Sequence, residues 1–429
     1  MTTTSDTEVR TDHSPWGETS SQAFWRGTAA DRERVFAALR DHDPVSWQPP
    51  VEGAVAPVPG ETGYWAVVRH ADVVTVSRDV DRFISSGGVL YDDLPEDYRE
   101  MTQSFLGMDS PRHETMRRIV AAAFTPKQIG RITEEIETAA REVVDAFASA
   151  PSGEVEFVSA CAGPLPVRMF SQMFGVPPEL EADVVQAADD VVAWADEESP
   201  DGRSIGEVQL TAAYRLHEIA QQVVAQRREH PTDDLFTSLA EARVDDEGLS
   251  DHEIGSFFVL LSVAATDTTK HTAALALRSL SDHPDQRDWL VEDFDARIDR
   301  AVEEFIRHST AVMTFRRTAA VDTELGGRAI RAGDKVVMFY ASGNRDERVF
   351  ADPERLDLTR DPNPHVGFGG GGRHFCLGNQ LAKTSLRALF RQLLTRVPDI
   401  HTVGEPDLAG TNFIRGVKRQ RAAFTPETS

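Results

Sequence analysis

Cys376 lies between a glycine-rich loop and a segment of helical period, in the sequence GFGGGGRHFCLG that spans residues 367–378. Glycines let backbone N–H groups approach a sulfur or a flat ligand without a Cβ in the way, and a helix N-terminus adds positive potential. Both features favour the thiolate, which is the form of cysteine that attacks substrates or ligates metals. Spacing alone leaves both roles open.

Other residue types argue against two of the possible roles of this loop. A nucleophilic cysteine needs a base and oxyanion donors, and beyond the neighbouring His374 nothing resembles a hydrolase site. A phosphate-binding loop would carry Lys-Ser/Thr after its glycines, and this one does not. Both roles are therefore disfavoured, but a single cysteine after glycines is weak evidence for any other role.

An acid and an alcohol, Asp267 and Thr268, are adjacent in VAATDTT (residues 263–269), within a long apolar segment of helical period. Such side chains can simply bond to nearby backbone carbonyls and bend a helix. Next to a reactive centre the same pair can transfer protons.

Three further sets of charged residues have spacings that matter in combination. Glu304 and Arg307 stand at i and i+3, which places them on one helix face. His113 and Arg117 share one predicted helical turn, and Arg317 follows in FRRTAAVD. Taken singly, all of these could be ordinary surface residues.

The loop at residues 367–378 resembles the haem-binding loop of the cytochrome P450 superfamily. The His-Arg turn, the acid-alcohol helix, the Glu-x-x-Arg helix, the Asn-Arg-Asp segment at 344–346 and the cysteine loop follow in that family's order. The resemblance implies a haem b cofactor with Cys376 as the metal ligand. It also implies a mainly α fold with a minor β region, in which the haem lies buried between the long distal helix and the cysteine loop.

The resemblance assigns a role to each remaining motif. Thr268 would hydrogen-bond the bound dioxygen and its water, and Asp267 would pass protons towards it. The Glu304–Arg307 pair would be buried and completed by an arginine of PERLD, which we assign to Arg355. Cationic residues would hold the haem propionates: His113, Arg117, Arg317 and His374.

Two positions depart from the common family pattern. Gly369 occupies the position usually held by the loop phenylalanine, with Phe368 one step further from the cysteine, and Ala265 stands where relatives often have glycine. A similar extra glycine occurs in the actinobacterial branch that oxidises sterols, methyl-branched lipids and terpenoid chains. The predicted activity is therefore insertion of one oxygen atom from O2 into a lipophilic small molecule.

Alternative outcomes of the same chemistry are desaturation, coupling or another oxidative rearrangement. A peroxygenase and a non-enzymatic haem carrier or gas sensor are further possibilities.

No flavin or iron-sulfur motif is present, so we expect electrons from a ferredoxin and a ferredoxin reductase. Basic residues are candidates for docking that partner: Arg112, Arg118, Arg373, Lys383 and Arg387. Mostly apolar segments are expected to line the substrate pocket: residues 84–106, Phe257, Phe258, Leu261, residues 311–315 and residues 412–414.

Composition limits the remaining possibilities. The chain has 429 residues, 40% of them hydrophobic, and a formal net charge of -25, which argues against nucleic acid or anionic membranes as partners. No apolar run approaches the roughly 20 residues of a membrane span. Of the two cysteines, Cys161 lies in an apolar context and is expected to be a buried core residue. We expect a cytoplasmic monomer with a disordered N-terminus at residues 1–21 and one domain at residues 22–429.

Helical period dominates residues 125–280, with one predicted helix at 128–148 and another at 250–280 that begins at the cap Ser250. A strand-like piece is predicted at 64–70, and β-like segments follow Arg307. The stretch from Asn344 to Gly372 is rich in Pro, Asp and Gly and is expected to be irregular. A helical period resumes after Cys376.

Overall fold

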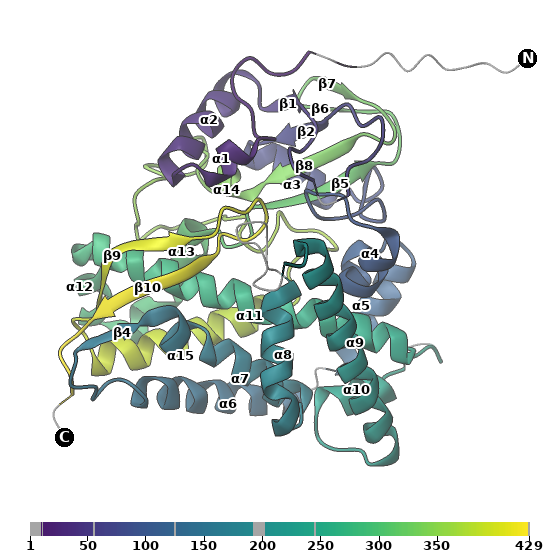
Figure 1. Cartoon of the computed structure of the whole chain (residues 1–429). Helices are drawn as coiled ribbons and strands as arrows, with labels where there is room; N and C mark the ends of the chain where they lie inside the picture. The colour runs from purple at the N-terminus through teal and green to yellow at the C-terminus, as the bar shows by residue number, and fades with distance from the viewer. Residues whose placement is uncertain are drawn as a thin grey trace, which may run out of the picture.

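The computed structural model describes residues 10, 12–54, 56–123, 126–191, 202–243 and 246–427. It is mainly helical with minor sheets, as the sequence predicts. In Figure 1 the largest sheet occupies the upper part of the molecule, and the long helices form the lower part.

The helices are α1 (Gln22–Arg26), α2 (Ala29–His42), α3 (His70–Arg78), α4 (Glu96–Gln103), α5 (Arg112–Ala123), α6 (Pro126–Asp145), α7 (Pro164–Phe174), α8 (Pro178–Val191), α9 (Ile205–Glu229), α10 (Leu235–Glu241), α11 (Asp251–Asp282), α12 (Pro284–Glu292), α13 (Phe294–Ser309), α14 (Tyr340–Gly343) and α15 (Asn379–Arg396). The described chain also contains a 3-10 helix, η1 (Ser104–Gly107), and a π-helix, η2 (Val158–Ala162).

The strands are β1 (Val45–Gln48), β2 (Tyr64–Val67), β3 (Phe83–Ile84), β4 (Glu154–Glu156), β5 (Thr314–Ala319), β6 (Thr323–Leu325), β7 (Arg328–Ile330), β8 (Lys335–Phe339), β9 (His401–Leu408) and β10 (Val417–Ala423). The five-stranded sheet has the order β1-β2-β8-β5-β3, and only the β2–β8 pair is parallel among these described strands. Smaller sheets join β4, β10 and β9, and β6 with β7.

Helix α11 is the centre of the helical part, where it packs on α4, α7, α9, α13 and α15 (Figure 1). Its start matches the prediction, because Ser250 accepts a hydrogen bond from the Glu253 backbone while the Glu253 carboxylate accepts one from the Ser250 backbone. Most of its residues are buried, so its stability comes mainly from packing against its neighbours.

The N-terminal prediction is wrong for the described residues 12–21. Thr19 and Ser20 are buried, the Thr19 backbone donates to Gln48 (3.0 Å), and the Thr19 hydroxyl lies 2.7 Å from the Tyr64 hydroxyl. These polar side chains order the segment because the sheet offers them buried polar partners. Residues 1–9 and 11 lie outside the described residues.

The chain between α14 and α15, residues 344–378, contains no helix or strand, as its composition predicts. This irregular segment ends at the cysteine loop. Among the described helices, none combines the length and the apolar character that crossing a membrane requires.

Candidate functional site

The cysteine loop is fixed to the end of α3 by close backbone contacts. Gly370 donates to the Ser77 hydroxyl (3.3 Å), and Arg78 donates to the Gly370 carbonyl (3.1 Å). A Cβ on Gly370 would lie 2.9 Å from the Val74 Cα, so only glycine permits this approach. The glycines therefore set the path of the loop relative to the sheet region.

Cys376 precedes α15 by three residues and is held at both backbone ends. Its N–H donates to the Phe368 carbonyl (3.1 Å), and its carbonyl accepts from the Asn379 side chain (2.8 Å). Burial raises the pKa of the thiol, whereas the Gly378 N–H and the Arg117 charge lower it. A bound cation would remove the burial penalty, which is how metal binding drives thiol ionisation.

Basic side chains converge beside this cysteine. His113 and His374 stack with ring centroids 4.1 Å apart, and Arg117 donates to the Phe375 carbonyl (2.7 Å). Burial lowers the pKa of His374 to about 2, assisted by the positive charges of Arg317, His113, Arg117 and Arg373. The structure thus brings together the four predicted propionate residues.

Several polar atoms of this cluster are buried without a partner among the described residues. They are both ring nitrogens of His113, Nδ1 of His374 and Nε of Arg317. Buried polar atoms without a partner are costly, and arginine and histidine N–H donors of this kind suit an anionic group. A dicarboxylate such as haem fits this donor set, with Cys376 at hand as a soft ligand for its iron.

The adjacent Arg316 and Arg317 lie in different environments. Arg316 pairs with Asp93 (2.5 Å) and donates to the Gly87 carbonyl. Arg317 faces the opposite side of β5, where its charge acts on His374. Nε lacks a partner in both arginines among the described residues, but it is the charge of Arg317 that acts on His374.

One face of α11 remains uncovered although the helix is otherwise buried. Leu261, Ala265 and Thr268 are partly exposed, and Ala264 is exposed, at the spacing of one helical stripe. The Thr268 hydroxyl donates to the Ala264 carbonyl (2.9 Å), and the helix continues unbroken through this point. An apolar stripe of this kind is typical of a helix that lines a flat ligand and a substrate chamber.

Asp267 points away from that stripe into the protein. Its side chain is 2% exposed, and Lys270 Nζ lies 2.6 Å from its Oδ1. Burial raises the pKa of Asp267, while Lys270 opposes the increase. Apart from this ion pair, neither carboxylate oxygen has a hydrogen-bond partner among the described residues.

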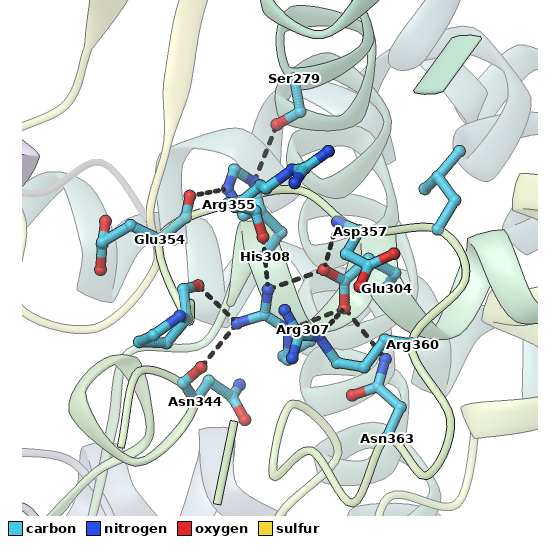
Figure 2. A network of polar contacts seen from close by, with 12 residues as sticks. Ser279, Glu304, Arg307, His308, Asn344, Glu354, Arg355, Asp357, Arg360 and Asn363 are labelled. Carbon is cyan, nitrogen blue, oxygen red and sulfur yellow. Dashed lines mark hydrogen bonds and ion pairs between the residues drawn. The ribbon is translucent and has the colours of Figure 1, made fainter. Parts of the chain in front are cut away.

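The Glu304–Arg307 pair is fully buried in α13, as predicted. Two hydrogen bonds of 2.7 Å join the side chains, and Arg307 uses its remaining donors on the carbonyls of Asn344, Pro353 and Arg355 (Figure 2). All five N–H groups of the guanidinium are therefore satisfied. The pair fixes the irregular segment from within.

The third member of this network is Arg360, and the assignment to Arg355 is wrong. Arg360 Nε lies 3.3 Å from Glu304 Oε2 with a side chain 8% exposed, whereas the Arg355 side chain is 60% exposed and lies 3.6 Å from Asp285. Arg355 contributes only its backbone carbonyl (Figure 2). Asn363 and the Asp357 backbone complete the donors to Glu304.

The pocket prediction is wrong for Phe257 and Phe258, which are completely buried. Phe258 packs on the rings of Phe170, Phe174 and Phe236 at 5.0–5.1 Å between centroids, and Phe257 contacts Phe105 and Phe174. Both rings join α11 to its neighbours, so the helix presents Leu261 rather than these phenylalanines to the open stripe.

Most of the predicted docking cations are engaged in ion pairs with acidic side chains. Arg112 pairs with Glu247 and Glu253, Arg373 with Glu114, Lys383 with Glu303, and Arg387 with Asp299. Their charge is locally neutralised, so they do not form an unbroken positive patch.

Three site residues received no individual role in the sequence prediction, although Ser85 lies within the predicted pocket segment 84–106. Ser85 lies 3.2 Å from His374 Nε2, and Asp109 accepts from the Ser85 and Ser86 backbone N–H groups (2.7 and 2.9 Å). Lys270 is the third. Its i, i+3 spacing from Asp267 could have predicted this ion pair, because that spacing places both side chains on one helix face. The contacts of Ser85 and Asp109 depend on tertiary structure and left no local signal.

Comparison with known proteins gives a consistent result. The family model described as Cytochrome P450 matches residues 199–398. The chain is 38% identical over 404 residues to the methyl-branched lipid omega-hydroxylase of Mycobacterium tuberculosis, covering 94% of this chain and 93% of that protein. It is 34% identical over 395 residues to the steroid C26-monooxygenase of Mycolicibacterium smegmatis, covering 91% and 90%.

A solved structure agrees in fold over almost the whole length. A Mycobacterium marinum cytochrome P450 in complex with pseudoionone superposes with a TM-score of 0.92 at 49% identity, covering 97% of this chain and 100% of that one. The fold, the cysteine loop and the unsatisfied cationic cluster lead to the same conclusion as these relatives. The chain belongs to the cytochrome P450 family and is a haem-thiolate monooxygenase.

Proposed function

We propose that this enzyme inserts one oxygen atom of O2 into a lipophilic substrate of the branched-lipid, steroid or terpenoid class. The uncovered apolar stripe of α11 carries this proposal, because a chamber with such a wall binds hydrocarbon better than polar compounds. The names of the similar proteins, a methyl-branched lipid hydroxylase and a steroid monooxygenase, support the same class.

In this proposal Cys376 ligates the haem iron, and the cluster of His113, Arg117, Arg317 and His374 holds the propionates. Haem supplies the oxygen-activating chemistry when bound. The protein supplies the thiolate, the fixed cationic donors and the path of the loop, which Ser77 and Arg78 anchor to α3. The unpartnered nitrogens of the cluster support this role, because the propionates would satisfy them.

Proton supply is assigned to Asp267 and Thr268. Thr268 stands on the uncovered stripe, and its hydroxyl can exchange the Ala264 carbonyl for a water or a reacting oxygen. Asp267 is the buried acid next to it, with a pKa raised by burial, and a carboxyl group in this position can pass a proton towards the Thr268 hydroxyl. Electrons come from a separate ferredoxin and its reductase.

Binding spectroscopy tests the substrate class. The purified haem protein is titrated with pseudoionone, cholesterol and a methyl-branched fatty acid, and with glucose as a polar control. We expect a Soret shift with at least one lipid as water leaves the iron, and no shift with glucose. Absence of any shift with all three lipids would exclude the proposed class.

Carbon monoxide spectroscopy tests the ligand. The reduced wild-type protein with carbon monoxide should show the absorption maximum diagnostic of thiolate coordination, and Cys376→Ala should lack it. A variant Cys161→Ala is the matched control and should keep the spectrum, because Cys161 is completely buried in η2. An unchanged spectrum in Cys376→Ala would refute the assignment.

A further inference from the structure

Lys270 joins two carboxylates that lie on different helices. Its ammonium lies 2.6 Å from Oδ1 of Asp267 on α11 and 3.1 Å from Oδ1 of Asp189 on α8. The first carboxylate is buried, with its side chain 2% exposed, whereas the second is 58% exposed. The ammonium therefore connects the protein surface to the buried acid beside Thr268.

The surroundings of Lys270 restrict its freedom. The side chain is 17% exposed, and its Cδ would lie 3.6 Å from a Cβ placed on Gly163, at the start of α7. Burial disfavours the ammonium, but Asp267 and Asp189 more than offset this and raise the pKa of Lys270. The ammonium is thus a permanent cation near neutral pH, held between α7, α8 and α11.

The two carboxylates do not contribute equally. An ion pair to an exposed carboxylate is weakened by solvent, whereas a buried carboxylate depends on its counterion to remain charged. Burial raises the pKa of Asp267, Lys270 lowers it, and Asp189 raises it again. The neighbouring His271 stays neutral, because burial lowers its pKa to about 3, with Lys270 adding to the effect.

We propose that Lys270 is a positioning residue for proton delivery, which holds the buried Asp267 ionised and oriented. Lys270 divides its ammonium between Asp267 and Asp189 of α8, so the Asp189 carboxylate weakens the hold of Lys270 on Asp267. The inference rests on the proposed role of Asp267 in proton transfer.

A set of single substitutions in the haem-loaded enzyme tests this coupling. The readout is the infrared band of a protonated buried carboxyl, assigned to Asp267 by its loss in Asp267→Asn and followed against pH with pseudoionone present. Lys270→Gln should move the midpoint of this band upwards by more than about one pH unit. Asp189→Asn should move it downwards by less than that, because it removes a competing negative charge. Lys270→Arg should restore the wild-type midpoint.

Turnover provides the second readout. With pseudoionone as substrate and a surrogate ferredoxin system, Lys270→Gln should release several-fold more hydrogen peroxide per electron pair and show a larger solvent isotope effect than wild type, and Lys270→Arg should reverse both changes. Midpoint shifts of the same sign in Lys270→Gln and Asp189→Asn, or no shift in either, would overturn the inference.

The failure of the underlying function would look different. If Asp267→Asn leaves product and peroxide yields unchanged, the proposed proton role of Asp267 is refuted, whereas an effect of Asp267→Asn without opposite shifts in the other two variants refutes only the role of Lys270. The carbon monoxide spectrum of each variant should remain that of thiolate-ligated haem, which controls for cofactor loss.

Discussion

The Glu304–Arg307 pair is completed by Arg360 rather than by Arg355. This assignment predicts which of the two arginines contributes more to the stability of the protein. We compare Arg360→Gln with Arg355→Gln, which removes the same charge from the same irregular segment. Arg360 contacts the buried Glu304 carboxylate at 3.3 Å and donates to the Ala351 carbonyl at 2.9 Å. Arg355 lies 3.6 Å from Asp285 at the surface.

The expected magnitudes follow from burial. A contact with a buried charge is worth about 1.5–3 kcal/mol, and a neutral hydrogen bond adds about 1 kcal/mol. Glu304 keeps its two bonds from Arg307, so the loss should stay below the roughly 3–5 kcal/mol of a buried charge left alone. We expect Arg360→Gln to cost about 2.5–3 kcal/mol, the lower part of the sum of these two contributions. The exposed pair of Arg355 is worth about 0–1 kcal/mol.

Urea unfolding of the haem-loaded protein, followed by tryptophan fluorescence and by the Soret band, measures the difference. Arg360→Gln should unfold at a lower urea concentration with an unchanged m-value, and Arg355→Gln should unfold close to wild type. If Arg355→Gln proves as destabilising as Arg360→Gln, or more so, the assignment of Arg360 to the network is incorrect.

Two further predictions concern the cysteine loop and pH. Gly370→Ala should destabilise the protein by about 1–3 kcal/mol, because its Cβ meets the Val74 Cα at 2.9 Å, whereas Gly378→Ala points into open space and should melt like wild type in calorimetry. Acidification from about pH 7.5 to about pH 5.5 should lower the unfolding free energy by about 1.4 kcal/mol through His271 alone. The reason is that the unfolded chain binds a proton at this histidine below about pH 6.5, while burial keeps it neutral down to its folded pKa of about 3. His271→Asn preserves an acceptor for the Val417 N–H and should remove this part of the pH dependence in urea titrations; an unaltered pH dependence would contradict it.

The parts of the site that local patterns determine were predictable. The cap at Ser250, the adjacent acid and alcohol and the i, i+3 spacing of Glu304 and Arg307 depend on residues a few positions apart. Local periodicity and capping therefore located α11 and α13 without knowledge of their neighbours. The family order of these motifs then gave the fold and the cofactor.

The errors concern features that only tertiary structure determines. Arg355 and Arg360 both lie in the irregular segment, whose path decides which guanidinium turns inwards. Helix α11 has apolar residues on nearly all of its faces. Its sequence therefore does not indicate which face, such as that of Phe258, is buried in the core and which face forms the open stripe. Thr19 is polar by composition but has a buried hydroxyl partner in Tyr64.

Asn344 forms hydrogen bonds to two segments that lie far apart in the sequence. Its amide nitrogen donates to the Thr310 hydroxyl (2.9 Å), and its amide oxygen accepts from the Val366 N–H (2.8 Å). Thr310 leads into β5, which carries Arg317, and Val366 leads into the loop of Cys376. A single amide thus connects the segment that leads into β5 with the segment that leads into the cysteine loop. A ligand that displaced β5 would therefore also shift the loop of Cys376 through this amide, and we expect bulky and slender substrates to give different reduction potentials.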